Sequence, residues 1–93
     1  MTEANILAIG STAQDLKRVA LYIGRGATSS AKRFLEEAIK NSQLIDRNAT
    51  PPYILKYIKE IRELSKISDQ MERAEQALMI GCLMQNIVVA TRH

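Results

Sequence analysis

The sequence is poor in the residues that carry most catalytic and metal chemistry. Among 93 residues it has one cysteine, Cys82, and one histidine, His93. A single cysteine excludes an internal disulfide framework and a cysteine-based metal site. No internal imidazole is present to activate a serine or cysteine nucleophile, or to complete an inward-facing Glu-x-x-His metal pair. We therefore expect no catalytic residue, no metal ligand and no cofactor.

Long hydrophobic runs and an export signal are also missing. The apolar piece 6–9 is too short for a signal-peptide core, and no lysine or arginine precedes Lys17. The longest apolar stretch, 77–90, is interrupted by Gln85 and Asn86 and is shorter than the roughly 20 residues that span a bilayer. We expect a cytoplasmic protein that does not enter a membrane.

Charge of one sign is not concentrated in the chain. Its 13 lysines and arginines stand against 10 aspartates and glutamates, which gives a formal net charge of +3. This balance lacks the dense positive stripe of a dedicated nucleic-acid-binding protein. The length predicts one domain, 1–93, whose small core leaves its stability marginal, so that association with a partner would stabilise it.

The hydrophobic pattern predicts an all-α fold. Alternating or short β-branched runs, which are typical of strands, are absent apart from 87–89. Apolar residues instead recur at spacings of three and four, the period of a helix face. We expect a small antiparallel bundle of about four helices: one from the cap Thr2 to Ile23, one starting after Ser29 or Ser30 and reaching Ile45, one capped by Thr50 and reaching Leu64, and one from about Asp69 to near Thr91.

Three local features leave alternatives. Gly10 costs about 1 kcal/mol relative to alanine inside a helix, so the first helix either continues through it, or bends or breaks there. The segment 65–69 is either a turn between two helices or a kink in one. In the third helix either Tyr57 or Ile58 points inward. The face of the last helix expected inside comprises Ile67, Met71, Ala74, Leu78, Gly81 and Val88.

The segment GRGATSS, residues 24–30, has two interpretations. A helix N-terminus after glycine offers free N–H groups to an anion, with charge available from nearby cations. The residues of such an anion site would be Arg25, Ser29, Ser30 and Lys32. However, the spacing differs from a Walker motif and no strand precedes it. The favoured interpretation is structural: Gly24 or Gly26 ends the first helix, and Ser29 or Ser30 caps the second.

Two further clusters have functional alternatives that are not favoured. One cluster consists of acids on two helices, Glu36 and Glu37 on one and Glu60 and Glu63 on the other. It bears a slight resemblance to the magnesium-binding acids of helical nucleotide pyrophosphohydrolases. However, lysines surround these acids, as on solvated ion-pair faces. Basic residues on the second and third helices form the other cluster, which a nucleic acid would contact. They are Arg25, Lys32, Arg33, Arg47, Lys56, Lys59, Arg62 and Lys66, with Glu60 and Glu63 interrupting the stripe.

The last helix is the most informative segment, because 77–84 is apolar on every side and 87–90 resumes the run. Cys82 lies within it, where a free thiol behaves as a small buried hydrophobe. A helix that is hydrophobic all round needs burial all round, so either the other three helices wrap it or a second chain covers it. We favour the second chain, with an interface of Leu78, Met79, Leu83, Met84 and Ile87.

The expected function follows from missing chemistry and surplus apolar surface. We expect a non-enzymatic regulatory or adaptor protein that forms a homodimer and acts by binding another protein. The alternatives are a nucleic-acid-binding protein that uses the basic faces of the second and third helices, and a magnesium-dependent all-α nucleotide hydrolase.

Overall fold

The computed structural model describes residues 2–92 and confirms the all-α prediction. Four α-helices pack compactly, and no strand occurs within the described residues. The helices are α1 (Glu3–Gly24), α2 (Thr28–Ser42), α3 (Pro52–Glu63) and α4 (Gln70–Arg92), with two short 3₁₀ helices, η1 (Arg47–Ala49) and η2 (Leu64–Lys66). The segment 64–69 therefore separates α3 from α4 and is not a kink in one helix.

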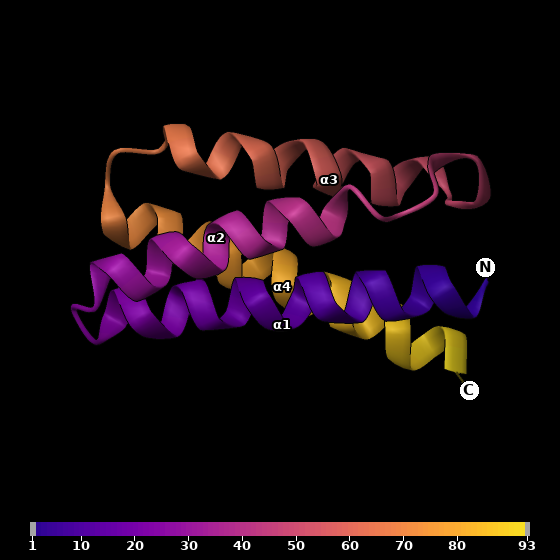
Figure 1. The fold of residues 1–93 in the computed structure, drawn as a ribbon, viewed down its shortest axis with the longest axis horizontal. Coiled ribbons are helices and arrows are strands. Elements are labelled where there is room, and N and C mark those ends of the chain that lie inside the picture. The colour runs from indigo at the N-terminus through magenta and orange to yellow at the C-terminus, as the bar shows by residue number, and fades with distance from the viewer. Residues whose placement is uncertain (1, 93) are drawn as a thin grey trace.

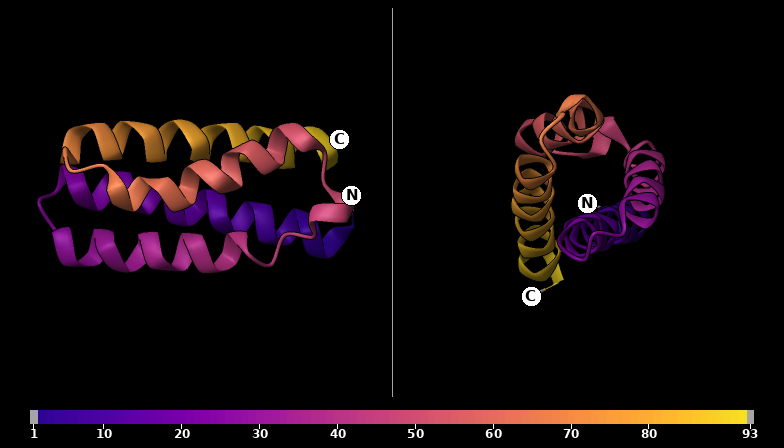
Figure 2. Two further views of the ribbon diagram at one scale, coloured as in Figure 1. Left: turned by 90° about the horizontal axis from the view of Figure 1, so that it is seen from above. Right: turned by 90° about the vertical axis from the view of Figure 1, so that its left-hand side faces the viewer.

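Successive helices run antiparallel along the long axis of a body that measures 36 × 23 × 17 Å (Figure 1). Seen end-on, they follow one another round the bundle in chain order, so that α4 returns beside α1 and α2 lies diagonally across from α4 (Figure 2). The backbone of α1 approaches α4 and α2 closely, whereas α3 stands further from its neighbours. This difference in spacing decides which residues fill each contact.

The helix α1 begins at the predicted cap, since the side chain of Thr2 accepts a hydrogen bond from the backbone N–H of Asn5. It runs through Gly10 without interruption, so the alternative of a break there is wrong. A cost of about 1 kcal/mol for one glycine is small against the packing that holds a long helix in place. Gly10 lies beside Val88 of α4, within this packed contact.

The turn between α1 and α2 is made by the glycine at position 26, whose φ of 74° is in the left-handed region. The N–H of Gly26 donates to Ile23 and that of Ala27 donates to Tyr22, which together close a Schellman motif at the end of α1. The expectation that Ser29 or Ser30 caps the second helix is wrong. Ala27 is the N-cap and supplies no side-chain hydrogen bond, because the motif already fixes the chain's entry into α2.

The connection between α2 and α3 is fastened to α1 by a buried asparagine. Asn5 accepts from the backbone N–H of Asp46 at 2.7 Å and donates to Oγ1 of Thr50 at 3.0 Å. The hydroxyl of Thr50 also donates to the Asp46 carbonyl. Thr50 is therefore not the cap of the third helix, as the sequence suggested; Pro51 takes that position and α3 begins at Pro52.

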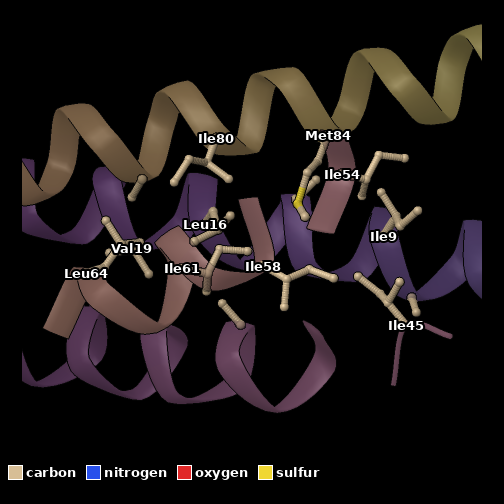
Figure 3. Close-up of a cluster of buried hydrophobic side chains, with 14 of the residues drawn as sticks. Ile9, Leu16, Val19, Ile45, Ile54, Ile58, Ile61, Leu64, Ile80 and Met84 are labelled. Carbon is tan, nitrogen blue, oxygen red and sulfur yellow. The ribbon is translucent and has the colours of Figure 1, made fainter. Parts of the chain in front are cut away.

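The core lies between all four helices and is made of aliphatic side chains (Figure 3). In α3 the structure selects Ile58 for the interior and leaves Tyr57 half-buried. The second helix ends at Ser42 and does not reach Ile45 as expected, and Leu44 beyond its end is 71% exposed. The largest core side chains are Ile9, Leu16, Ile54, Ile58, Ile61, Leu64, Ile80 and Met84.

The rotation of α4 differs from the expected one. Its buried residues are Ala77, Ile80, Gly81, Met84 and Val88. Gly81 and Val88 were predicted correctly, but Met71 and Leu78, also expected inside, are exposed. Cys82, expected to be buried, is exposed as well.

Candidate functional site

The contact between α1 and α4 sets the rotation of α4. A side-chain carbon added at Gly81 would lie 3.1 Å from the carbonyl oxygen of Ala13 and 3.3 Å from Cβ of Leu16. Only glycine fits this approach without displacing backbone. Because Gly81 and the small residue Ala77 face the interior, the larger residues Leu78, Met79 and Cys82 beside them turn outward.

These larger residues form an exposed surface, which we call the α4 outer face. Its members are Leu78, Met79, Cys82, Leu83, Asn86, Val89 and Ala90. Leu78, Met79 and Val89 are 47%, 45% and 46% exposed. Half-exposed side chains of this size, gathered on one helix, are more than the scattered surface hydrophobes of an ordinary monomer.

The structure divides the five predicted interface residues into three groups. Leu78 and Met79 are exposed, and Leu83 and Ile87 are half-buried beside α3. Met84 has no exposed surface and points from α4 into the bundle beside Ile54 (Figure 3). Placing Met84 on the outward side was therefore wrong, because the interior follows the small residues of α4.

Four exposed members of the face, Cys82, Asn86, Val89 and Ala90, were missed as interface residues. Cys82 and Val89 stand three and ten residues after Met79 and share its side of the helix. Asn86 lies between them and is also exposed. The signal in the sequence was the spacing of three, four and three residues from Met79 to Val89. It is hard to see because the segment is apolar on all sides.

A hollow beside the α4 outer face extends it towards α3. It has a volume of about 460 Å³, and Tyr53, which is 60% exposed, stands at its edge. Its lining residues are Tyr53, Tyr57, Leu83, Asn86, Ile87, Ala90 and Thr91. On the opposite side of α4, the exposed Leu7 of α1 lines a smaller hollow with Gln85 and Val88. The apolar surface is therefore widest around the C-terminal half of α4.

No charged residue occurs in the α4 segment 76–91, whereas acidic residues stand before it at Glu72 and Glu75. Among the described helices, α4 is the one that is long and apolar enough, by length and composition alone, to cross a membrane. In the structure one side of it is packed against the bundle, with Ile80 and Met84 fully buried. Its outer side carries the exposed apolar residues Leu78, Met79 and Val89.

The candidate anion site is assembled in part. A hollow of about 380 Å³ lies where α2 begins and α3 joins α4, and its lining includes Ser29 and Lys32 but neither Arg25 nor Ser30. Arg73 of α4 also lines it, and its guanidinium donates to backbone carbonyls including that of Leu64, at 3.1 Å. This cation is thus engaged in holding the connection before α4. The guanidinium of Arg25 lies instead 6.0 Å from the ring of Tyr22.

The carboxylates proposed for magnesium are not brought together. Within the described part of the chain, no group of three or more His, Cys, Asp and Glu side chains lies close enough to hold a metal ion. Glu63 is exposed and pairs with Lys66 at 2.9 Å, and this hydrogen bond and charge hold the pKa of Glu63 below its usual range. His93 lies outside the described residues. The magnesium hypothesis gains no site from the structure.

The basic residues of α3 are exposed as expected, and three cations surround one hollow. Arg47, Lys59 and Arg62 line a space of about 390 Å³ together with Leu55 and Glu63. The carboxylate of Glu63 contributes a negative charge within the same hollow. The arrangement is a mixed surface that is basic on balance, on the side of α3 that faces α2.

One buried carboxylate remains, on the side of α1 that faces α2. Asp15 accepts a hydrogen bond from Nδ2 of Asn41 at 2.7 Å and lies 3.5 Å from the guanidinium of Arg18. Burial raises the pKa of Asp15, and these two contacts oppose that shift in part. No other titratable side chain donates to it, so a structural role explains its environment.

The α4 outer face is therefore the surface with the strongest functional signal in the described residues. It is apolar, free of charge and half-exposed, and two hollows border it. Its interpretation depends on this geometry alone. In comparisons with known proteins, no family model, no curated protein and no solved structure matches the chain.

Proposed function

We propose that the protein acts by protein–protein contact, as a regulatory or adaptor protein without catalysis of its own, and that it pairs with a second copy through the α4 outer face. The observation that carries the proposal is the exposure of Leu78, Met79 and Val89 on a helix segment without any charge. Removing apolar surface of this kind from water contributes about 25 cal/mol for each Å² buried. Covering the face therefore stabilises a chain whose own core is small.

The charge distribution favours a second copy as the occupant. Each chain carries a net charge of +3, and exposed cations such as Arg33 on α2 and Lys59 on α3 lie on other sides of the bundle. Two copies that meet through α4 keep these cations apart, since α2 lies diagonally across from α4 (Figure 2). Pairing through the exposed side of α3 would bring Lys56, Lys59 and Arg62 of one copy towards the same cations of the other.

The available area fits a reversible dimer. A standard interface removes about 800 Å² from each partner. A fully exposed aromatic side chain offers roughly 150–250 Å², so half-exposed large side chains offer on the order of 100 Å² each. The α4 outer face with Leu7 and Tyr53 at its borders thus approaches, without exceeding, the standard size. We expect association at micromolar concentration.

A charge placed on the face tests the proposal. We expect Met79→Lys and Val89→Lys to convert the dimer into a monomer with unchanged helical circular dichroism, because the ammonium would lose its water at the interface. Lys59→Glu, on the solvated side of α3, should leave the mass unchanged. Light scattering coupled to gel filtration measures the mass of each. Met84→Lys is unsuitable for this purpose, since Met84 lies in the core and its replacement would unfold the chain.

Three results would contradict the proposal. A wild-type mass near the chain's own 10.4 kDa at micromolar and higher concentration would show that the face stays uncovered. A dimer that persists in both lysine variants would place the contact elsewhere. A monomer that sediments with phospholipid vesicles would assign the face to a membrane surface and would overturn the pairing.

A second candidate function rests on the hollow between Arg47, Lys59 and Arg62, which is the basic surface predicted for a nucleic acid. Phosphate contacts would make such binding strongly dependent on salt. Fluorescence anisotropy with a labelled duplex and a labelled single strand, at low and high salt, measures it. Lys59→Glu should weaken binding, and the absence of binding at low salt would remove this candidate.

A further inference from the structure

Four exposed residues in the uncharged part of α4 follow a heptad spacing. Met79, Cys82, Asn86 and Val89 are separated by three, four and three residues, and we call these four the outer row. The spacing places them at the a and d positions of a heptad, with Met79 and Asn86 at a and Cys82 and Val89 at d. Such a row is the seam through which one helix pairs with another.

The amide at Asn86 is the one polar group in the outer row. A single asparagine at an a position fixes the register of a parallel two-helix pair, because the two amides face each other and exchange hydrogen bonds. We infer that two copies pair α4 against α4 in parallel and in register, with Asn86 opposite the same residue of the second copy. This inference rests on the self-association proposed above and names its geometry.

An antiparallel pair of the same rows suits these residues less well. It would set Met79 opposite Val89 and Cys82 opposite Asn86, and a thiol is a weak hydrogen-bond partner for an amide. In the antiparallel pair the two amides would lose water without full replacement of their hydrogen bonds. The parallel pair brings Glu75 close to its own copy, but both carboxylates remain in water, so their repulsion costs less free energy. Glu75 instead marks where the seam ends.

The neighbours of the outer row are compatible with close approach. Leu78 and Leu83 flank it on the α1 and α3 sides, and Ala90 follows Val89 on its exposed surface. None of these flanking positions carries a charge, so a second copy meets no like charge between Leu78 and Ala90. The knobs of the row can therefore insert between the flanking residues of the facing helix.

Cysteine cross-linking distinguishes the two directions. In a Cys82→Ser background, Met79→Cys and Val89→Cys each introduce one thiol near one end of the outer row. We expect each variant alone to give a covalent dimer with a short bismaleimide, about a hundredfold faster than a control, because paired thiols share a high effective concentration. The control is Arg33→Cys in the same background, exposed on α2 and diagonal to α4.

Each outcome has a distinct meaning when light scattering is run on the same samples. Cross-linking only in an equimolar mixture of the two variants would overturn the parallel direction in favour of the antiparallel one. Dimers that cross-link in neither case would overturn the outer row as the seam and leave self-association standing. Monomeric samples that still fold would overturn the inference together with the proposed function.

Asn86→Val provides an independent test on the same helix. An aliphatic residue at this position strengthens pairing but removes the register signal, so we expect a tighter association with loss of the unique dimer mass and the appearance of larger species. Asn86→Gln keeps an amide and serves as its control. A variant valine chain that remains a single dimer of unchanged affinity would show that Asn86 does not face its own copy.

Discussion

The helices α3 and α4 differ in where their large apolar side chains lie. In α3 the large residues Ile54, Ile58 and Ile61 are fully or almost fully buried, and the outer side carries lysines and arginine. In α4 the inner side includes Ala77 and Gly81, and large apolar residues stand outside. The difference follows from spacing, since α4 lies close to α1 whereas α3 stands off and is filled in by bulky side chains.

This comparison teaches that hydrophobic size alone does not indicate which side of a helix is buried. Where two backbones approach, small residues are required, because interiors are close-packed. Leu78, Met79 and Val89 of α4 are therefore available for a second contact, whereas Ile54, Ile58 and Ile61 of α3 are not. The surplus apolar surface on α4 is a consequence of how tightly this helix packs on its inner side.

Replacing a large buried residue of α3 by a small one, as found on the inner side of α4, should have the largest effect on stability. Ile61→Ala removes a fully buried side chain and leaves a cavity, for which we expect a loss of about 2–5 kcal/mol in the free energy of unfolding. Urea unfolding followed by helical circular dichroism measures this loss. Leu78→Ala, on the outer side of α4, should change the stability of the monomer by about 0.5 kcal/mol or less. Equal losses in the two variants would contradict the contrast between the helices.

Replacing a small buried residue of α4 by a larger one, as found on the inner side of α3, should have a smaller but clear effect on stability. Gly81→Val pushes a branched side chain against the Ala13 carbonyl, 3.1 Å from the first added carbon, and should cost about 1–3 kcal/mol. Gly10→Ala is its matched control, because the added carbon would lie 3.9 Å from Val88 and gains helix propensity of about 1 kcal/mol. Opposite signs in thermal unfolding are expected. A Gly81→Val variant as stable as wild type would show that α1 and α4 are not in close contact.

The sequence was sufficient for the number and placement of the helices. Their ends carry strong local signals, such as Thr2 at the start of α1 and the proline pair before α3. The interior of α3 was also predictable, because its polar and apolar residues segregate to opposite sides. Caps were less predictable: Thr50 has the residue type of a cap, but tertiary contact with Asn5 uses its hydroxyl instead.

The candidate site was predictable in kind but not in its residues. A segment that is apolar on all sides indicates surplus surface without giving its rotation. Met84 was therefore assigned to the interface although it is buried, and Leu78 was assigned both to the interface and to the inner face. The rotation depends on the close approach at Gly81, which involves Ala13, far away in the sequence. A local pattern does not contain this contact. The outer row became visible only once the inner side was known.

The smallest expected effect is the pH dependence of stability that Asp15 contributes. Asp15 lies on the side of α1 that faces α2, where the contact between the helices is polar. Burial raises the pKa of Asp15, so the unfolded chain loses this proton at lower pH than the folded chain does. The contribution of Asp15 to stability should therefore fall as pH rises from the ordinary pKa of an aspartate through the raised pKa of Asp15. Asp15→Asn does not titrate and still accepts from Asn41.

The measurement for Asp15 is the difference in unfolding free energy between wild type and Asp15→Asn, followed from acidic to neutral pH so that the other carboxylates cancel. We expect the unfolding free energy of wild type to decrease relative to that of the variant over this range, by about 1 kcal/mol or less. Glu63→Gln is the contrasting control on α3. Its lowered pKa predicts the opposite slope, with wild type gaining as pH rises, although exposure keeps that effect small. A wild type that gains on Asp15→Asn towards neutral pH would show that the charge of Asp15 is stabilised by Arg18 and Asn41 more than burial disfavours it.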